Sequence, residues 1–172
     1  MANTYTLISS VTVGSGGAAN IEFTSIPATY TDLQVLTSFR ASDTGTWQSA
    51  LVTFNSATTN FGVTRLYGYG GSTTGSDAYS GGSNMTGHFA TYNSATANTF
   101  SNGSIYIPNY AGSNYKSMSS DSVTENDAAD NILGLTAGLW SNSAAITSVK
   151  FVPYTGNFMQ YSTAYLYGIS NA

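Results

Sequence analysis

The chain has 172 residues, of which only 7% are charged, and its formal net charge is −4. This length suits a single domain, which we expect to span residues 1–172. The four basic residues are spread along the sequence, so they form no patch that would bind nucleic acid through its phosphates. There is no cysteine to form a disulfide. No apolar run approaches the roughly 20 residues of a membrane-spanning helix.

The composition also favours strands over helices and a folded chain over a disordered one. Charged helix formers are scarce, and the polar surface must come from Ser, Thr, Asn, Gln and Gly. The sequence contains 13 Tyr, 8 Phe and 2 Trp. Because each aromatic side chain buries about 150–250 Å², these residues can replace the missing aliphatic ones in a core. We therefore expect a folded all-β domain.

Alternating apolar and polar residues, bounded by Gly, Asn, Ser and Pro, predict the first strands. Tyr5, Leu7, Val11 and Val13 are expected to share one face of the first strand. Further alternation predicts strands over 21–23, 33–39, 50–54 and 61–69.

Residues 70–86 are almost all Gly, Ser, Thr, Asp and Asn, and they form the longest predicted loop. Long loops in compact domains are often functional. A solvated hairpin excursion is the alternative that we favour.

The second half of the chain predicts strands over 99–107, 115–123, 132–140, 145–152 and 159–169. In 132–140, Leu133, Leu135 and Leu139 fall on one face, while Gly134 and Gly138 fall on the other. Glycines on one face leave room for another backbone or a partner. About ten short strands at this spacing predict a sandwich or a barrel.

Few residues of the sequence could carry catalytic chemistry, and none of them falls in a specific motif. His88 is the only histidine, and the sequence around it lacks the strand–turn–helix context of a nucleophile elbow, so we expect an ordinary strand-edge histidine. The chain's one acidic concentration holds Asp121, Glu125, Asp127 and Asp130. Such a loop can bind Ca²⁺ or supply two carboxylates for glycoside cleavage, but its spacing favours a solvated acidic loop. We expect no enzyme activity, no metal and no cofactor.

Two aromatic residues are candidates for partner or glycan contact. Trp47 falls in the polar stretch 41–48, and Tyr79 falls in the predicted loop 70–86. Trp and Tyr are enriched at binding hot spots, so an aromatic ring in a polar loop is a modest indication of recognition. The alternative is a ring that folds back over the edge of the core.

Five segments together carry a resemblance to a known group of proteins. They are MANTYTLI (1–8), FTSIPATYTDL (23–33), SIYIPNY (104–110), GLWS (138–141) and FMQYSTAYLYGI (158–169). The chain resembles the small virion structural proteins of marine and cyanobacterial tailed phages, which decorate capsids or form fibre-like tail parts. The resemblance spans nearly the whole chain. It implies a jelly-roll-like sandwich, many copies per particle and threefold assembly, but it transfers no site residues.

With this resemblance, the predicted fold is an antiparallel β-sandwich of jelly-roll type. The predicted function is that of a non-enzymatic virion structural protein, foremost an outer capsid decoration or cement protein. It would be made in the host cytoplasm and would sit on the particle surface as a homotrimer against the major capsid protein or other virion proteins. The first alternative is a tail fibre or baseplate module that binds host surface glycans. The second is a glycan-cleaving enzyme using two of the four acidic residues of 121–130.

Overall fold

The computed structural model describes residues 4–44, 48–71, 73–124 and 131–170, and every regular element among them is a β-strand. No helix in these ranges is long and apolar enough to cross a membrane. The strands of the first half are β1 (Tyr5–Thr12), β2 (Ile21–Phe23), β3 (Asp32–Ser38), β4 (Gln48–Phe54), β5 (Phe61–Tyr69) and β6 (Thr73–Gly82). Those of the second half are β7 (Met85–Ala90), β8 (Asn102–Ile107), β9 (Lys116–Thr124), β10 (Ile132–Trp140), β11 (Val149–Pro153) and β12 (Thr163–Ile169).

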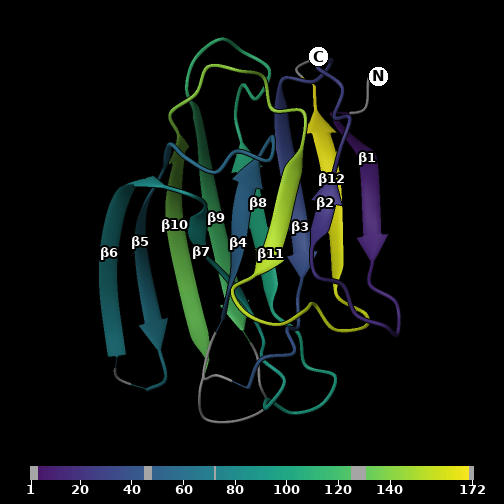
Figure 1. Ribbon diagram of the computed structural model, residues 1–172, viewed down its shortest axis with the longest axis vertical. Helices are drawn as coiled ribbons and strands as arrows, with labels where there is room; N and C mark the ends of the chain where they lie inside the picture. The colour runs from purple at the N-terminus through teal and green to yellow at the C-terminus, as the bar shows by residue number, and fades with distance from the viewer. Residues whose placement is uncertain (1–3, 45–47, 72, 125–130, 171–172) are drawn as a thin grey trace.

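The strands form two antiparallel sheets that pack face to face (Figure 1). The large sheet has eight strands in the order β1-β12-β3-β8-β9-β10-β5-β6, and the small sheet has the order β2-β11-β4-β7. Nested pairs run from the chain ends inward: β1 pairs with β12, β2 with β11, β3 with β8, and β4 with β7. A long hairpin rolled up in this way is a jelly roll. The predicted fold is therefore confirmed.

Two further strand pairs extend the roll on one side. In the sequence, the pair β5–β6 falls between β4 and β7, and the pair β9–β10 falls between β8 and β11. In space, β10 pairs with β5, so the four strands lie next to one another on one side of the large sheet. The predicted loop over 70–86 is wrong, because most of it is β6, and β7 begins at Met85. The hairpin alternative is correct. Strand β6 lies at the edge of the large sheet with mostly exposed side chains, so its sequence has no apolar alternation to reveal it.

Aromatic side chains fill much of the space between the sheets. Phe54 of the small sheet contacts Phe61 and Trp140 of the large sheet, with ring centroids 6.3 and 6.0 Å apart. Phe39 packs against Phe158 at 4.6 Å and against Phe151 at 5.4 Å. These distances are typical of tilted and edge-to-face aromatic pairs, which add about 0.5–1.5 kcal/mol each beyond area burial. Aromatic residues thus supply the core, as the composition predicted.

The first strand departs from the predicted alternation. A β-bulge interrupts the pairing of β1 with β12 between Leu7 and Ser9, and an inserted residue reverses which face later side chains occupy. Tyr5 and Leu7 are therefore exposed, whereas Val13 is buried in the core. The prediction that these residues share one face is wrong.

Strand β10 turns its glycines inward and its leucines outward. A Cβ atom added at Gly134 would lie 2.3 Å from the ring of Phe89 and 3.1 Å from the carbonyl oxygen of Gly87. The glycines thus allow the close approach of another strand, β7, as the sequence predicted. Leu133, Leu135 and Leu139 are left on the exposed surface of the large sheet.

Gly134→Ala tests this close approach. The added methyl group must displace the ring of Phe89, and overpacking of this kind costs about 1–3 kcal/mol. We expect urea denaturation to show that loss in the free energy of unfolding. Gly68→Ala on β5 is the matched control, because its Cβ would meet only the carbonyl oxygen of Thr73 at 4.0 Å. Equal stabilities for the two variants would contradict the packing described.

Candidate functional site

The main candidate site is the outward surface of the large sheet over β5, β9 and β10, here called the leucine face. It consists of Leu66, Val123, Leu133, Leu135 and Leu139. Leu135 lies directly opposite Leu66 on β5, and Leu133 lies opposite Val123 on β9. Leu66 is 59% exposed and Leu135 is 52% exposed. The register therefore places these two pairs of apolar side chains side by side on neighbouring strands, and Leu139 lies further along β10.

The leucine face carries two shallow recesses. One open groove of about 540 Å³ runs between Leu66, Leu133 and Leu135 and is bordered by β6. A second groove of about 520 Å³ lies beside Ala137 and Leu139, over the small residues Gly62 and Ala78. Small side chains between large ones leave recesses into which apolar groups of a partner can insert. Contiguous exposed apolar patches of this kind mark interaction sites in soluble proteins.

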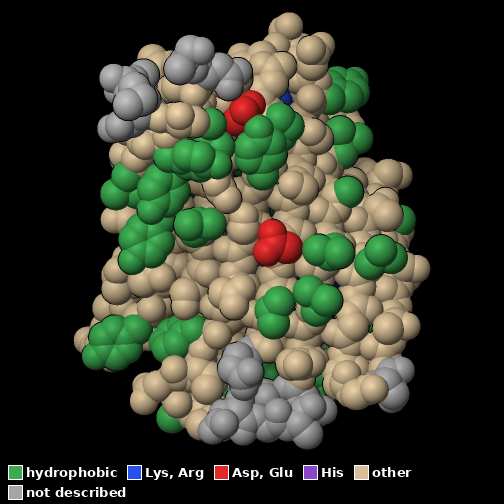
Figure 2. Space-filling model, turned by 180° about the vertical axis from the view of Figure 1, so that it is seen from behind, with side chains coloured by type: hydrophobic (Ala, Val, Ile, Leu, Met, Phe, Trp, Pro, Cys, Tyr) green, Lys and Arg blue, Asp and Glu red, His purple; other side chains and the backbone are tan. Residues whose placement is uncertain are grey.

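A second apolar group lies on the same surface at the β1 side of the sheet. It includes Tyr5, Leu7, Leu36, Tyr106 and Tyr165, all of which are exposed. Figure 2 shows hydrophobic side chains on both sides of an acidic group near the centre of this surface.

Asp121 marks the boundary between the two apolar groups. It lies on β9 between Ser104 of β8 and Leu135 of β10. Its side chain is exposed, so its charge stays in water and needs no partner within the sheet. A partner that covers the leucine face would meet this carboxylate at the edge of the contact.

The structure describes only some of the candidate site residues predicted from the sequence. Trp47 lies outside the described residues, as do Glu125, Asp127 and Asp130. Tyr79 lies on β6 rather than in a loop, and its half-buried ring packs against the core. Its hydroxyl donates to the carbonyl oxygen of Asn84 at 2.7 Å. The role of Tyr79 in binding stays a prediction.

In the described ranges, no three His, Cys, Asp or Glu side chains gather in a way that could hold a metal ion.

His88 lies on β7, the edge strand of the small sheet, but its ring is completely buried between the sheets. Its Nε2 atom lies 2.7 Å from the hydroxyl of Thr37, and its Nδ1 atom lies 2.8 Å from the hydroxyl of Ser120. Burial lowers the pKa of His88 from 6.5 to about 4, because the charged imidazolium would lose its hydration. The ring is therefore neutral at pH 7 and links the two sheets through two hydroxyl groups.

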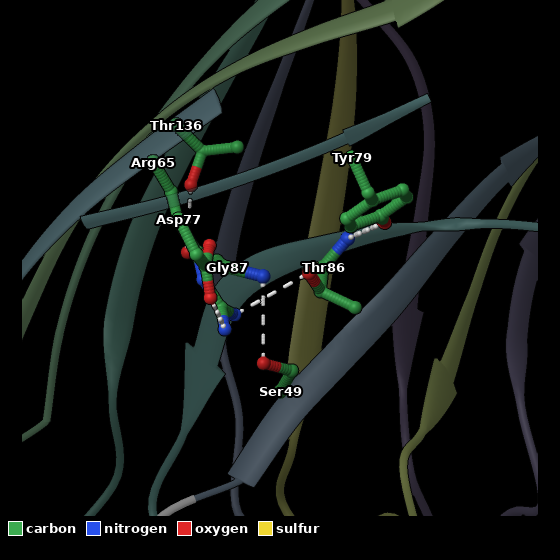
Figure 3. A network of polar contacts seen from close by, with 7 residues as sticks. All are labelled: Ser49, Arg65, Asp77, Tyr79, Thr86, Gly87 and Thr136. Atoms are coloured by element: carbon green, nitrogen blue, oxygen red, sulfur yellow. Dashed lines mark hydrogen bonds and ion pairs between the residues drawn. The ribbon is translucent and has the colours of Figure 1, made fainter. Parts of the chain in front are cut away.

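A polar network lies on the opposite face of β5 from the leucine face (Figure 3). Arg65 binds both carboxylate oxygens of Asp77 at 2.6 Å and donates from Nη1 to the hydroxyl of Thr86 at 3.3 Å. The backbone N–H of Thr86 donates to the hydroxyl of Tyr79 at 3.2 Å. This network was not predicted from the sequence. The alternation of 61–69 does place Arg65 and Leu66 on opposite faces of the strand, but it does not reveal the partners of Arg65.

Fold and surface together define the chain as an antiparallel jelly-roll sandwich with an uncovered apolar face on its large sheet. No protein-family model, no curated protein and no solved structure matches this chain.

The buried histidine predicts a dependence of stability on pH. The unfolded chain takes up a proton on His88 near pH 6.5, while the folded chain does so only near pH 4. Between these values unfolding takes up a proton, so the free energy of unfolding falls as the pH falls. We expect a loss of about 2 kcal/mol between pH 7 and pH 5 in urea denaturation.

His88→Gln is the control for this measurement. The amide keeps hydrogen-bonding capacity but does not titrate, so the variant is expected to lose the pH step. Since the chain has one histidine, its imidazole signals in NMR spectra report the same titration directly. An imidazole pKa near 6.5 in the folded protein would contradict the burial described.

Proposed function

We propose that this chain is a non-enzymatic structural protein on the surface of a tailed-phage particle, where it decorates the outer capsid. The setting rests on the sequence resemblance to virion structural proteins. The mode of attachment rests on the leucine face, which is the single observation that carries the proposal. Its partner is the major capsid protein, and copies of the chain assemble as homotrimers.

The leucine face supports docking by apolar burial rather than by charge. Fully burying a leucine contributes about 1.5–3 kcal/mol, and Leu66, Leu133, Leu135 and Leu139 are each roughly half exposed. The chain has only four Lys and Arg residues, so attraction between opposite charges is a small part of any contact. Binding of this kind is expected to persist when the salt concentration is raised.

The location of the protein on the particle is the first test. Virions of the phage whose genome encodes this chain would be purified and reconstructed by cryo-EM. The sandwich would then be fitted to their density. We expect copies that repeat over the capsid shell, with the leucine face turned toward the capsid protein. Density confined to the tail would contradict capsid decoration and favour a host-recognition module. Absence from purified particles would contradict a virion role altogether.

The leucine face itself is tested by Leu66→Thr combined with Leu135→Thr. Threonine keeps the preference for a strand but removes most of the apolar area. If each leucine contributes about 1 kcal/mol to docking, affinity for particles lacking the protein falls roughly tenfold to thirtyfold. Co-sedimentation with such particles measures this change.

Leu7→Thr provides the matched control for the docking variant. Leu7 is about as exposed as Leu135 but lies on β1, at the far edge of the same sheet. We expect this variant to bind particles as the unaltered protein does. If the double variant binds particles as tightly as the unaltered protein, docking through the leucine face is contradicted.

A further inference from the structure

A separate cavity of about 350 Å³ lies on the other side of β5 from the leucine face. Its lining comes from β4, β5, β7, the segment before β4 and the residue after β11. The lining residues are Asp43, Gln48, Ser49, Arg65, Thr86 and Tyr154. This volume falls at the lower end of the range for small-molecule sites. Its size suits a ligand of one or two rings.

The charges around this cavity disfavour an anionic ligand. The guanidinium of Arg65 is neutralised by its paired contacts with Asp77, both at 2.6 Å. Asp43 accepts hydrogen bonds from the backbone N–H of Thr44 at 2.9 Å and from the Gln48 amide at 3.0 Å. The Asp43 carboxylate therefore leaves the cavity slightly negative. An anionic ligand would meet this carboxylate without an unpaired cation to offset it.

The hydrogen-bonding groups of the cavity suit a ligand that carries hydroxyl groups. The hydroxyl of Ser49 accepts from the backbone N–H of Gly87 at 3.4 Å, and that of Thr86 accepts from Arg65. Each of these two hydroxyl groups keeps a hydrogen to donate. The partly buried carboxylate of Asp43 can accept further hydrogen bonds, so the lining offers both donors and acceptors.

Gln48 fixes the position of Asp43 beside the cavity. Its side chain is buried, and its Nε2 atom donates to Asp43 and, at 2.7 Å, to the hydroxyl of Thr155. These contacts fix the orientation of the amide. Its Oε1 atom has no hydrogen-bond partner. This oxygen has almost no accessible surface, so a ligand in the cavity does not contact it, and the part that Gln48 plays is to hold the carboxylate of Asp43 in place.

Tyr154 supplies an apolar surface at the rim. It directly follows β11, and its backbone N–H donates to the carbonyl oxygen of Ser49 at 3.0 Å, which anchors the residue beside β4. Its side chain is 68% exposed. A fixed backbone with an exposed aromatic ring gives a flat face against which the C–H groups of a sugar can pack.

We propose that this cavity binds one or two units of a neutral saccharide. Tyr154 covers a face of the sugar ring, while Ser49, Thr86 and Asp43 bind its hydroxyl groups and Gln48 positions Asp43. The pair Arg65–Asp77 and the hydroxyl of Tyr79 position Thr86. The site does not depend on the docking role, because its lining shares no residue with the leucine face.

Titration of the full chain with neutral hexoses, N-acetylhexosamines and their disaccharides, followed by saturation-transfer NMR and calorimetry, tests the site. We expect at least one of these sugars to bind, with Tyr154→Ala weakening its affinity about tenfold. Tyr115→Ala is the matched control, because Tyr115 is 65% exposed but lines none of this cavity. It is expected to leave the affinity unchanged. Thermal unfolding of both variants confirms that they are folded.

Three outcomes would overturn the proposal. They are no binding of any neutral sugar, binding that Tyr154→Ala leaves intact, and binding restricted to acidic sugars. None of these bears on docking, which the Leu66→Thr and Leu135→Thr variant tests on its own. Conversely, that double variant is expected to bind the sugar normally.

Discussion

The approach of the small sheet to the large one depends on bulky side chains that lie opposite glycines. A Cβ at Gly103 would lie 2.3 Å from the ring of His88, and one at Gly134 would lie 2.3 Å from the ring of Phe89. Both bulky residues belong to β7, the edge strand of the small sheet. Close packing of large against small groups gives an interior its density. Here it lets a short edge strand seal one side of a sandwich whose core is rich in aromatic rings.

The same arrangement accounts for the apolar outer surface. Side chains alternate between the two faces of a strand, so once the glycines of β10 face inward, its leucines must face outward. A strand chosen only to close the core would place the leucines inside. The outward position of the leucines therefore depends on the packing of β7, and a larger residue in place of Gly134 would push the sheets apart. The surface that we propose for docking and the closure of the core are two consequences of one alternation.

Sequence patterns predicted the strands whose two faces differ in burial. They failed for β6, because most side chains of this edge strand, which is rich in Gly, Ser and Thr, are exposed. They also failed for the faces of β1, because one bulge residue reverses the alternation. In β10 the pattern separated leucines from glycines, but only the position of β7 decides which set is buried. The polar cavity was beyond prediction, since its lining joins residues from five separate parts of the chain.

The leucine face is built on strands inserted into the jelly roll, whereas the cavity is lined mostly by the roll itself and meets one inserted strand, β5. The nested pairs from β1–β12 to β4–β7 complete the roll by themselves, whereas β5–β6 and β9–β10 extend it. On β5, Leu66 points to the leucine face and the neighbouring Arg65 points to the cavity. Function resides in sites added to a fold rather than in the fold itself. Since adjacent residues of one strand face opposite sides, a copy docked by its leucine face would keep the cavity on the side away from its partner. The proposed attachment and the proposed sugar binding would then be compatible, because β5 separates the two surfaces.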